Sequence, residues 1–350
     1  MSLKTILSWN KRKGALKVRK TETSAWRLAV QIGFTLVSLF TGWQFIRFVH
    51  AAKTTVSGPL PAYSPGVEAY LPISGLMGVL DWIYQGTLNV VHPAATVLFL
   101  IFVAVSLLFR KAFCGWICPI GFLSESLARL GQVLFKKNVR LPNWLDIPLR
   151  SLKYLVLGFF VWAIFSMSAE ALHGFITSPY NKVVDIKMMD FFVRLSAFGA
   201  TVILALVLLS VVIHSFWCRY LCPYGALVGL FSWLSPVKVR RDAHLCTDCK
   251  LCDEICPARL PVSVKGTISS VECIGCADCV TTCPVPKALV FGTRKRIFDS
   301  KRLAIAVVAV FLIGYFAAQV GNAWESRLAP NEIRYHVKRM YESEYGHPGR

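Results

Sequence analysis

Five long apolar stretches alternate with polar and basic segments along this chain. They occupy residues 26–46, 93–109, 154–172, 197–217 and 303–321. A helix needs about 20 mostly apolar residues to cross the hydrocarbon core of a bilayer, so the pattern predicts five transmembrane helices. Residues 66–91 are also apolar, but Glu68, Asp81 and several glycines interrupt them. We expect that segment to be interfacial or re-entrant.

The composition agrees with a membrane protein. The 350 residues are 55% hydrophobic and only 17% charged, and their mean hydropathy is +0.52. Soluble domains carry about 25% charged residues. The sequence therefore predicts an all-α polytopic membrane bundle, in contact with membrane lipid.

The basic residues predict the orientation of this bundle. The chain has 39 Lys and Arg against 19 Asp and Glu, a net charge of +20. Outside the predicted spans, 28 Lys and Arg fall on the side of the N-terminus and 10 on the other side. Because cytoplasmic loops are enriched in Lys and Arg, we expect the N-terminus inside and the C-terminus outside, in the periplasm. The cations flank apolar spans without an interleaved aromatic platform, so nucleic acid is not an expected partner.

A cysteine motif occurs twice, each time directly after a predicted span. The stretch FCGWICPIGFL begins at Phe113 and WCRYLCPYGAL begins at Trp217. Two hairpins of two spans, each ending in this CxxxCP motif, predict a parallel repeat. We expect Pro119 and Pro223 to begin cytoplasmic helices. If the spans continue as helices, the cysteines of each pair, four residues apart, share one helix face.

Four membrane-edge cysteines therefore have several interpretations. They are Cys114, Cys118, Cys218 and Cys222. With the hairpins side by side, their sulfurs could hold a third metal or iron–sulfur centre, or a soft metal such as Cu(I). They could instead form two redox-active dithiols, or pack as small buried hydrophobic side chains.

Eight further cysteines form two runs in the last predicted cytoplasmic segment. Each run has the spacing CxxCxxCxxxCP of bacterial two-cluster ferredoxins, in which the fourth cysteine of one run binds the cluster of the other. The predicted ligands of one [4Fe–4S] cluster are Cys246, Cys249, Cys252 and Cys283. The predicted ligands of the other are Cys273, Cys276, Cys279 and Cys256. Zinc would be bound by four thiolates, usually in two CxxC pairs, a pattern that fits these runs poorly.

Three histidines lie near the outer ends of the predicted spans. His50, His92 and His173 could hydrogen-bond a bound quinone or quinol and take its protons, since imidazole titrates near neutral pH. Alternatively, they are polar residues that mark the ends of spans.

At these residues the chain resembles a known family. The paired CxxxCP motifs, the doubled ferredoxin run and stretches such as LPISGLM and LPNWLDIPLRSLKYL are similar to the NapH/NosR/CcoG-type polytopic membrane polyferredoxins, and within them to the YccM-type electron transport proteins. The likeness covers most of the chain. It implies that the CxxxCP cysteines and the eight cluster ligands fall on the cysteines named above.

The resemblance also implies a function in the bacterial cytoplasmic (inner) membrane. The expected function is electron transfer between the quinol pool and an unidentified redox protein partner, as a quinol dehydrogenase-type oxidoreductase component. The alternative is a copper-handling, reductase or assembly protein that uses the four membrane-edge cysteines. No side chain is expected to act as an acid–base catalyst in the ferredoxin.

The expected domains follow from these motifs. They are a basic cytoplasmic N-terminus (1–25), a membrane domain with four spans and both CxxxCP motifs (26–239), an inserted α+β cytoplasmic ferredoxin domain with two [4Fe–4S] clusters (240–291), a linker with the fifth span (292–321) and a periplasmic tail (322–350).

Overall fold

The computed structural model describes residues 8–9, 16–17, 24–55, 58–136, 139 and 141–347. Most of the predicted basic N-terminus lies outside these residues. Within the N-terminal segment, the described residues form two short antiparallel strands, β1 (Ser8–Trp9) and β2 (Leu16–Lys17).

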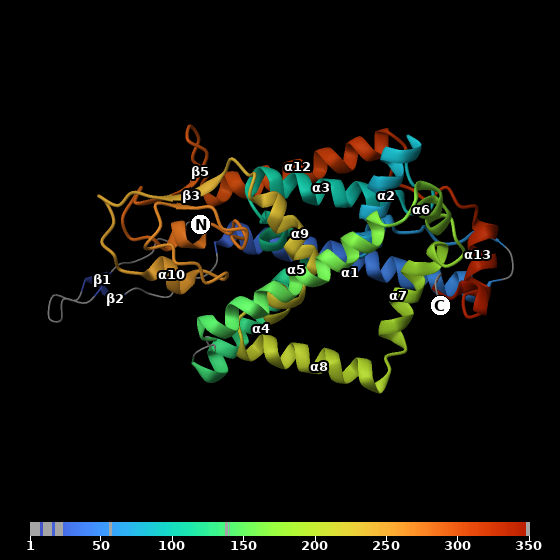
Figure 1. Cartoon of the computed structure of the whole chain (residues 1–350), viewed down its shortest axis with the longest axis horizontal. Coiled ribbons are helices and arrows are strands. Elements are labelled where there is room, and N and C mark those ends of the chain that lie inside the picture. Colours follow the sequence, from blue (N-terminus) through green and yellow to red (C-terminus); the bar gives the residue numbers. More distant parts are fainter. Residues whose placement is uncertain are drawn as a thin grey trace.

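Long helices form one end and the middle of the molecule, and a small mixed domain forms the other end (Figure 1). The helices are α1 (Ala25–Thr54), α2 (Pro72–Gln85), α3 (Pro93–Phe109), α4 (Pro119–Phe135), α5 (Asn143–Phe165), α6 (Ala169–Ile176), α7 (Val184–Val193), α8 (Ala197–Val212), α9 (Pro223–Ser232), α12 (Ser300–Val320) and α13 (Pro330–Arg339). Short 3-10 turns are η1 (Pro65–Tyr70), η3 (Asn181–Val183) and η5 (Ser343–Tyr345). Helix α3 contacts α2, α9 and α12 and so forms the centre of this arrangement.

Three described helices are long and apolar enough to cross a membrane, namely α1, α5 and α12. A fourth span is present if Ala169–Val193 and Ala197–Val212, which meet at 81°, count as one broken span. Helix α3, at the second predicted span, is apolar but has 17 residues. The protein is therefore a largely helical membrane protein, while the count of five spans stays a prediction.

Two predicted spans have different bounds in the structure. The third, expected at 154–172, is the helix Asn143–Phe165, which begins directly after Pro142. The fourth, expected at 197–217, ends as a helix at Val212. There Ile213 is extended, and the Val212 carbonyl accepts a 3.0 Å hydrogen bond from the Val139 amide. The Val212 carbonyl thus bonds to the distant Val139 amide and not to an amide of a further helical turn, and the helix ends there.

The small domain has a three-stranded antiparallel sheet in the order β4-β3-β5. Its strands are β3 (Lys238–Arg241), β4 (Thr267–Ile268) and β5 (Leu289–Gly292), and its helices are α10 (Leu251–Ile255) and α11 (Asp278–Thr282). Of the eight ferredoxin-type cysteines, Cys252 lies in α10 and Cys279 in α11, and the other six lie in the loops that connect these elements.

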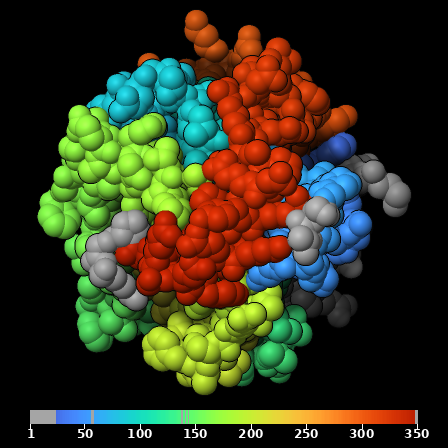
Figure 2. Space-filling view, turned by 90° about the vertical axis from the view of Figure 1, so that its right-hand side faces the viewer, coloured from blue at the N-terminus to red at the C-terminus, as the bar shows by residue number. Residues whose placement is uncertain are grey.

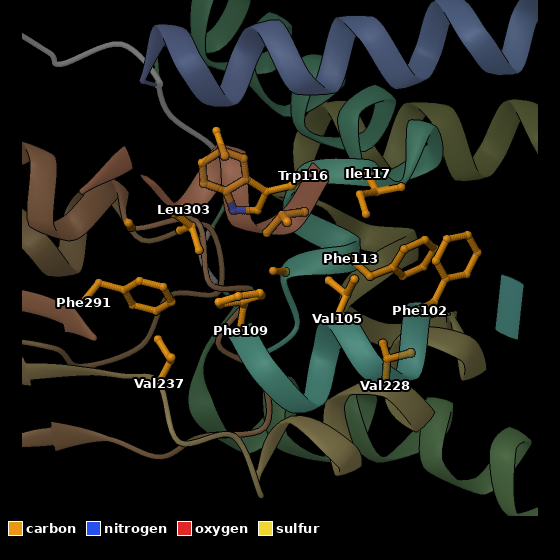
Figure 3. Packing of buried hydrophobic residues seen from close by; sticks show 14 of the residues in the cluster. Phe102, Val105, Phe109, Phe113, Trp116, Ile117, Val228, Val237, Phe291 and Leu303 are labelled. Atoms are coloured by element: carbon orange, nitrogen blue, oxygen red, sulfur yellow. The ribbon is translucent and has the colours of Figure 1, made fainter. Parts of the chain in front are cut away.

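One hydrophobic core joins the small domain to the membrane helices. Figure 3 shows Val237 and Phe291 of the small domain beside Phe109 of α3 and Leu303 of α12. The same cluster continues through Trp116. The small domain is thus packed onto the helices and is not a separate module on a linker.

The opposite end of the molecule is covered by the C-terminal segment. In Figure 2, α13 and the residues after it (red) lie across this end, between α1 (blue) and α7 (yellow-green). Lys182 Nζ donates to Glu332 Oε1 at 2.8 Å, and Val337 and Met340 are buried against Phe48 of α1.

Candidate redox metal centre

The two CxxxCP motifs have the same local structure. Each forms one π-helical turn, η2 (Phe113–Ile117) and η4 (Trp217–Leu221), which ends at an extended cysteine, Cys118 or Cys222. The expectation that the spans continue as helices through the motifs is wrong. Helix α3 stops at Phe109, before the first π turn, because Arg110 adopts a positive φ of 65°.

A proline follows each motif and begins a helix, as predicted. Pro119 starts α4 and Pro223 starts α9. Proline suits this position because the first helical residue has no intrahelical partner for its N–H. The Gly225 amide, in the first turn of α9, donates to the Cys222 sulfur at 3.2 Å.

The cysteines of the two motifs face the same cavity although the motifs lie about a hundred residues apart in the sequence. All four cysteines line one cavity. Burial and the thiols of Cys218 and Cys222 raise the pKa of Cys118 to about 12. Burial and the thiols of Cys222 and Cys114 raise the pKa of Cys218 to about 12. The fold therefore brings both repeats to a shared thiol site.

A buried lysine lies at this site. Lys111 interacts electrostatically with Cys114, Cys218 and Cys222, and its Nζ is 3.8 Å from Glu272 Oε2. A Cβ at Gly225 would contact the Lys111 ammonium at 3.6 Å. The ammonium group of Lys111, from beside the first motif, thus lies next to the second motif.

The eight ferredoxin-type thiols interact between the two runs as well as within them. The Cys283 thiol interacts electrostatically with those of Cys249 and Cys246, from the other run. Likewise, the Cys256 thiol interacts with that of Cys273. These are the crossed pairings that two cubanes need. An all-thiol set on tight loops also fits iron–sulfur ligation chemically.

These thiols differ in exposure. Cys252, Cys276 and Cys279 are buried, whereas Cys249 is exposed. Among the described residues, no group of three or more His, Cys, Asp or Glu side chains is close enough to hold a single metal ion.

The loop that carries Cys273 rests directly on the first CxxxCP motif. A Cβ at Gly115 would lie 2.6 Å from the Ile274 carbonyl oxygen, so only glycine allows this approach. The Trp116 indole donates to the Gly275 carbonyl at 3.0 Å. From the second motif, Arg219 donates to the Ala258 carbonyl, two residues after Cys256, at 2.9 Å.

Sequence reasoning did not identify a fully buried arginine that links three parts of the chain. Arg27, in the first turn of α1, is 2.6 Å from Glu125 of α4 and 2.5 Å from Asp278 of α11. Its Nε donates to the Gly115 carbonyl at 2.9 Å. Asp278 lies between Cys276 and Cys279. The position of Arg27 inside a predicted span could have indicated this link, because an arginine in an apolar span needs an anionic partner.

The structure does not bring the three outer histidines together through any described contact. His50 is exposed. His173 lies 3.2 Å from the buried Asp81. His92 is buried, 3.2 Å from Glu68 Oε1, while its Nε2 is 2.8 Å from the Asn181 carbonyl.

The His92 site predicts a pH dependence of stability. Burial alone would lower the pKa of His92, but the Glu68 carboxylate raises it from 6.5 to about 9. A raised pKa stabilises the folded state below pH 6.5, and this contribution is lost as the pH rises through about 9. We expect the thermal midpoint in detergent to fall over this window, and the fall to be smaller in His92→Gln. An unchanged pH profile in the variant would contradict the assignment.

Comparison with known proteins agrees with this site. A family model described as a 4Fe-4S binding domain matches residues 91–142 and 195–242. Each matched segment contains one CxxxCP motif, and both end before Cys246. No solved structure matches the chain.

Relatives cover most of the chain. The Escherichia coli (strain K12) protein YccM, which is named for electron transport, is 40% identical over 89% of this chain and 88% of its own length. Protein NirI of Paracoccus denitrificans is 31% identical over 70% of this chain and 36% of its own length. The ferredoxin-type protein NapH of Haemophilus influenzae is 29% identical over 59% of this chain and 69% of its own length.

The fold and the cysteine sites define a membrane iron–sulfur protein of electron transport. More specifically, the chain belongs to the family of polyferredoxin-type electron transport proteins that includes YccM, NirI, NosR and NapH. The resemblance seen in the sequence is thereby confirmed.

Proposed function

We propose that this protein conducts electrons from the quinol pool of the bacterial inner membrane to a redox partner through two [4Fe–4S] clusters. The observation that carries the proposal is the contact between the ferredoxin loops and both CxxxCP motifs. The packing of Gly115 against Ile274 and the bond from Arg219 to Ala258 fix the cluster loops at the membrane edge. Such fixed short distances favour electron transfer between centres.

The crossed thiol pairings support the ligand assignment. We assign one cluster to Cys246, Cys249, Cys252 and Cys283. We assign the other to Cys273, Cys276, Cys279 and Cys256. When bound, the clusters supply one-electron redox chemistry, and the protein sets their potentials through burial, charge and hydrogen bonds to sulfur.

The positions of the two ligand sets give the proposed order of transfer. The Cys273 set is in contact with the CxxxCP segments and has no exposed member, so we place it nearer the donor. The other set includes the exposed Cys249, and we place it at the exit to the partner. The N-terminus and the ferredoxin domain would be cytoplasmic and the C-terminus periplasmic, as the Lys and Arg distribution favours.

The four CxxxCP cysteines are proposed as a third metal or iron–sulfur centre. Their position around one cavity supports this, as does the iron–sulfur family model that matches the segments carrying them. Lys111 would offset part of the negative charge of such a centre. The same thiols favour the alternative, a copper-handling or assembly protein, since soft thiolates also bind Cu(I).

Of the three histidines, His92 has a connection to a membrane cavity. Glu68 accepts a hydrogen bond from the hydroxyl of Tyr63 at 3.0 Å, and Tyr63 lines the cavity that ends at the CxxxCP cysteines. We propose the His92–Glu68 pair as the site that takes protons from quinol, with the Glu68 carboxylate as the acceptor and His92 as its charged partner. The structure offers no comparable link from His50 or His173 among the described residues.

Metal analysis and quinol reduction test the proposal. Anaerobically purified protein should contain iron and acid-labile sulfide, and a quinol analogue should reduce its clusters in membranes. The iron content per chain of the Cys114→Ser/Cys218→Ser variant should be lower than that of the wild type by more than the experimental error. Both ferredoxin-type EPR signals should remain. Copper that co-purifies with wild type but not with this variant, together with clusters that quinol does not reduce, would favour the alternative.

A further inference from the structure

A long apolar cavity leads from the outer part of the membrane helices to the four CxxxCP cysteines. Its volume is about 1000 Å³, at the upper end of ordinary ligand pockets. Its lining residues in α1 extend from Val30 to Gln44, a distance of about 21 Å at 1.5 Å per helical residue. A metal centre held by the cysteines would fill only one end. The remainder has the size and shape for an elongated molecule.

The wall of this cavity faces the lipid at one side. Val37 and Phe40 of α1 line the cavity and are 58% and 56% exposed. Phe34, Phe102 and Phe311 line its middle part. A ligand with an apolar chain could therefore enter from the bilayer.

Two phenols lie at the thiol end of the cavity. Tyr70 interacts with Ser38 through a side-chain hydrogen bond and electrostatically with Cys118. Tyr224 interacts electrostatically with Cys118 and Cys222. Phenol hydroxyl groups donate hydrogen bonds to carbonyl oxygens, so this end suits a ring that carries such oxygens.

The charges at this end are paired within the protein. Lys111 lies beside Glu272, and both Arg219 and Arg150 pair with Asp146. A phosphate headgroup would have to compete with Glu272 and Asp146 for these cations, whereas a neutral ring needs none of them.

We propose that this cavity binds an isoprenoid quinone, with the ring between Tyr70 and Tyr224 and the chain along α1. The inference deepens the proposed function, because it gives the quinol pool a site on this chain. The ring would lie next to the CxxxCP thiols, and Tyr63 would connect the same cavity to His92.

Two glycines of α1 provide a matched test. A Cβ at Gly33, which lines the cavity, would contact no atom within 4 Å, and the same is true at Gly42, which does not line it. Leucine at either position also favours the helix over glycine. Gly33→Leu should therefore fill the cavity without disturbing the fold, and Gly42→Leu is the control.

Binding of decylubiquinone to the full chain in nanodiscs measures the effect directly. We expect Gly33→Leu to weaken the Kd at least tenfold, Tyr70→Phe to weaken it several-fold, and Gly42→Leu to leave it unchanged. An unchanged Kd in Gly33→Leu, equal losses in both leucine variants, or recovery of phospholipid alone from the cavity overturns the inference.

Cluster reduction separates this inference from the proposed function. If decylubiquinol fails to reduce the clusters of the wild type although Gly33→Leu weakens quinone binding, the site stands and the quinol conduit fails. If decylubiquinol reduces the clusters equally fast in wild type and Gly33→Leu, the conduit stands and the site is wrong.

Discussion

Replacing cysteines in pairs should remove one cluster or two, depending on which pair is chosen. Cys246→Ala/Cys283→Ala should lose about four iron atoms per chain, because both thiols serve the same cubane. Cys246→Ala/Cys256→Ala should lose about eight, because these thiols serve different cubanes. The physical reason is that a cubane that lacks two of its four thiolates does not persist.

Iron and sulfide analysis with EPR on anaerobic preparations measures this difference. The two outcomes exchange places if each run holds its own cluster, since Cys246 and Cys256 would then share one. The matched pair Cys256→Ala/Cys273→Ala should again lose only about four iron atoms. Far-UV circular dichroism of each variant controls for loss of the helical fold.

Loss of the buried Arg27 should have the largest effect on stability. Arg27→Met leaves the carboxylate of Asp278 buried without its cation and leaves Glu125 with Arg129 alone. Breaking such a buried pair by removing one partner costs about 3–5 kcal/mol. Because Asp278 belongs to α11, which carries the proposed cluster ligand Cys279, the ferredoxin domain should also become more sensitive to protease.

Thermal unfolding in detergent and limited proteolysis measure these effects. Arg47→Met is the matched control on the same helix, because Arg47 is exposed and stacks on Trp43 at 4.9 Å. Its loss should cost below about 1 kcal/mol. Arg27→Lys should be intermediate, because an ammonium group cannot bridge two carboxylates as a guanidinium does. Equal losses in Arg27→Met and Arg47→Met would refute the role of Arg27 as a link.

Local patterns in the sequence were sufficient for the chemistry and the class of fold. The apolar stretches predicted a helical membrane protein because lipid requires long runs of apolar side chains. The helix starts at Pro119 and Pro223 followed from the fixed φ of proline. The spacing of cysteines indicated cubane ligands because cluster binding needs several thiolates on one short loop.

Other features depended on contacts between distant segments. The π turns at Cys114 and Cys218 were not predicted from the sequence pattern. The end of α8 at Val212 likewise depends on a bond to the distant Val139. Only the structure decided which acidic residue pairs with which histidine, namely Glu68 with His92 and Asp81 with His173.

By itself, the sequence determined that the chain enters the membrane, that it carries two kinds of cysteine motif, and that eight of the twelve cysteines form a ferredoxin pattern. Only the tertiary structure decided how these parts meet. Arg27 pairs with Asp278, 251 positions away, and donates a hydrogen bond to the Gly115 carbonyl, 88 positions away. Lys111, beside the first CxxxCP motif, interacts electrostatically with Cys218 and Cys222 of the second motif. Spacing along a chain fixes which side chains a single loop or helix presents, whereas packing fixes which loops share a core.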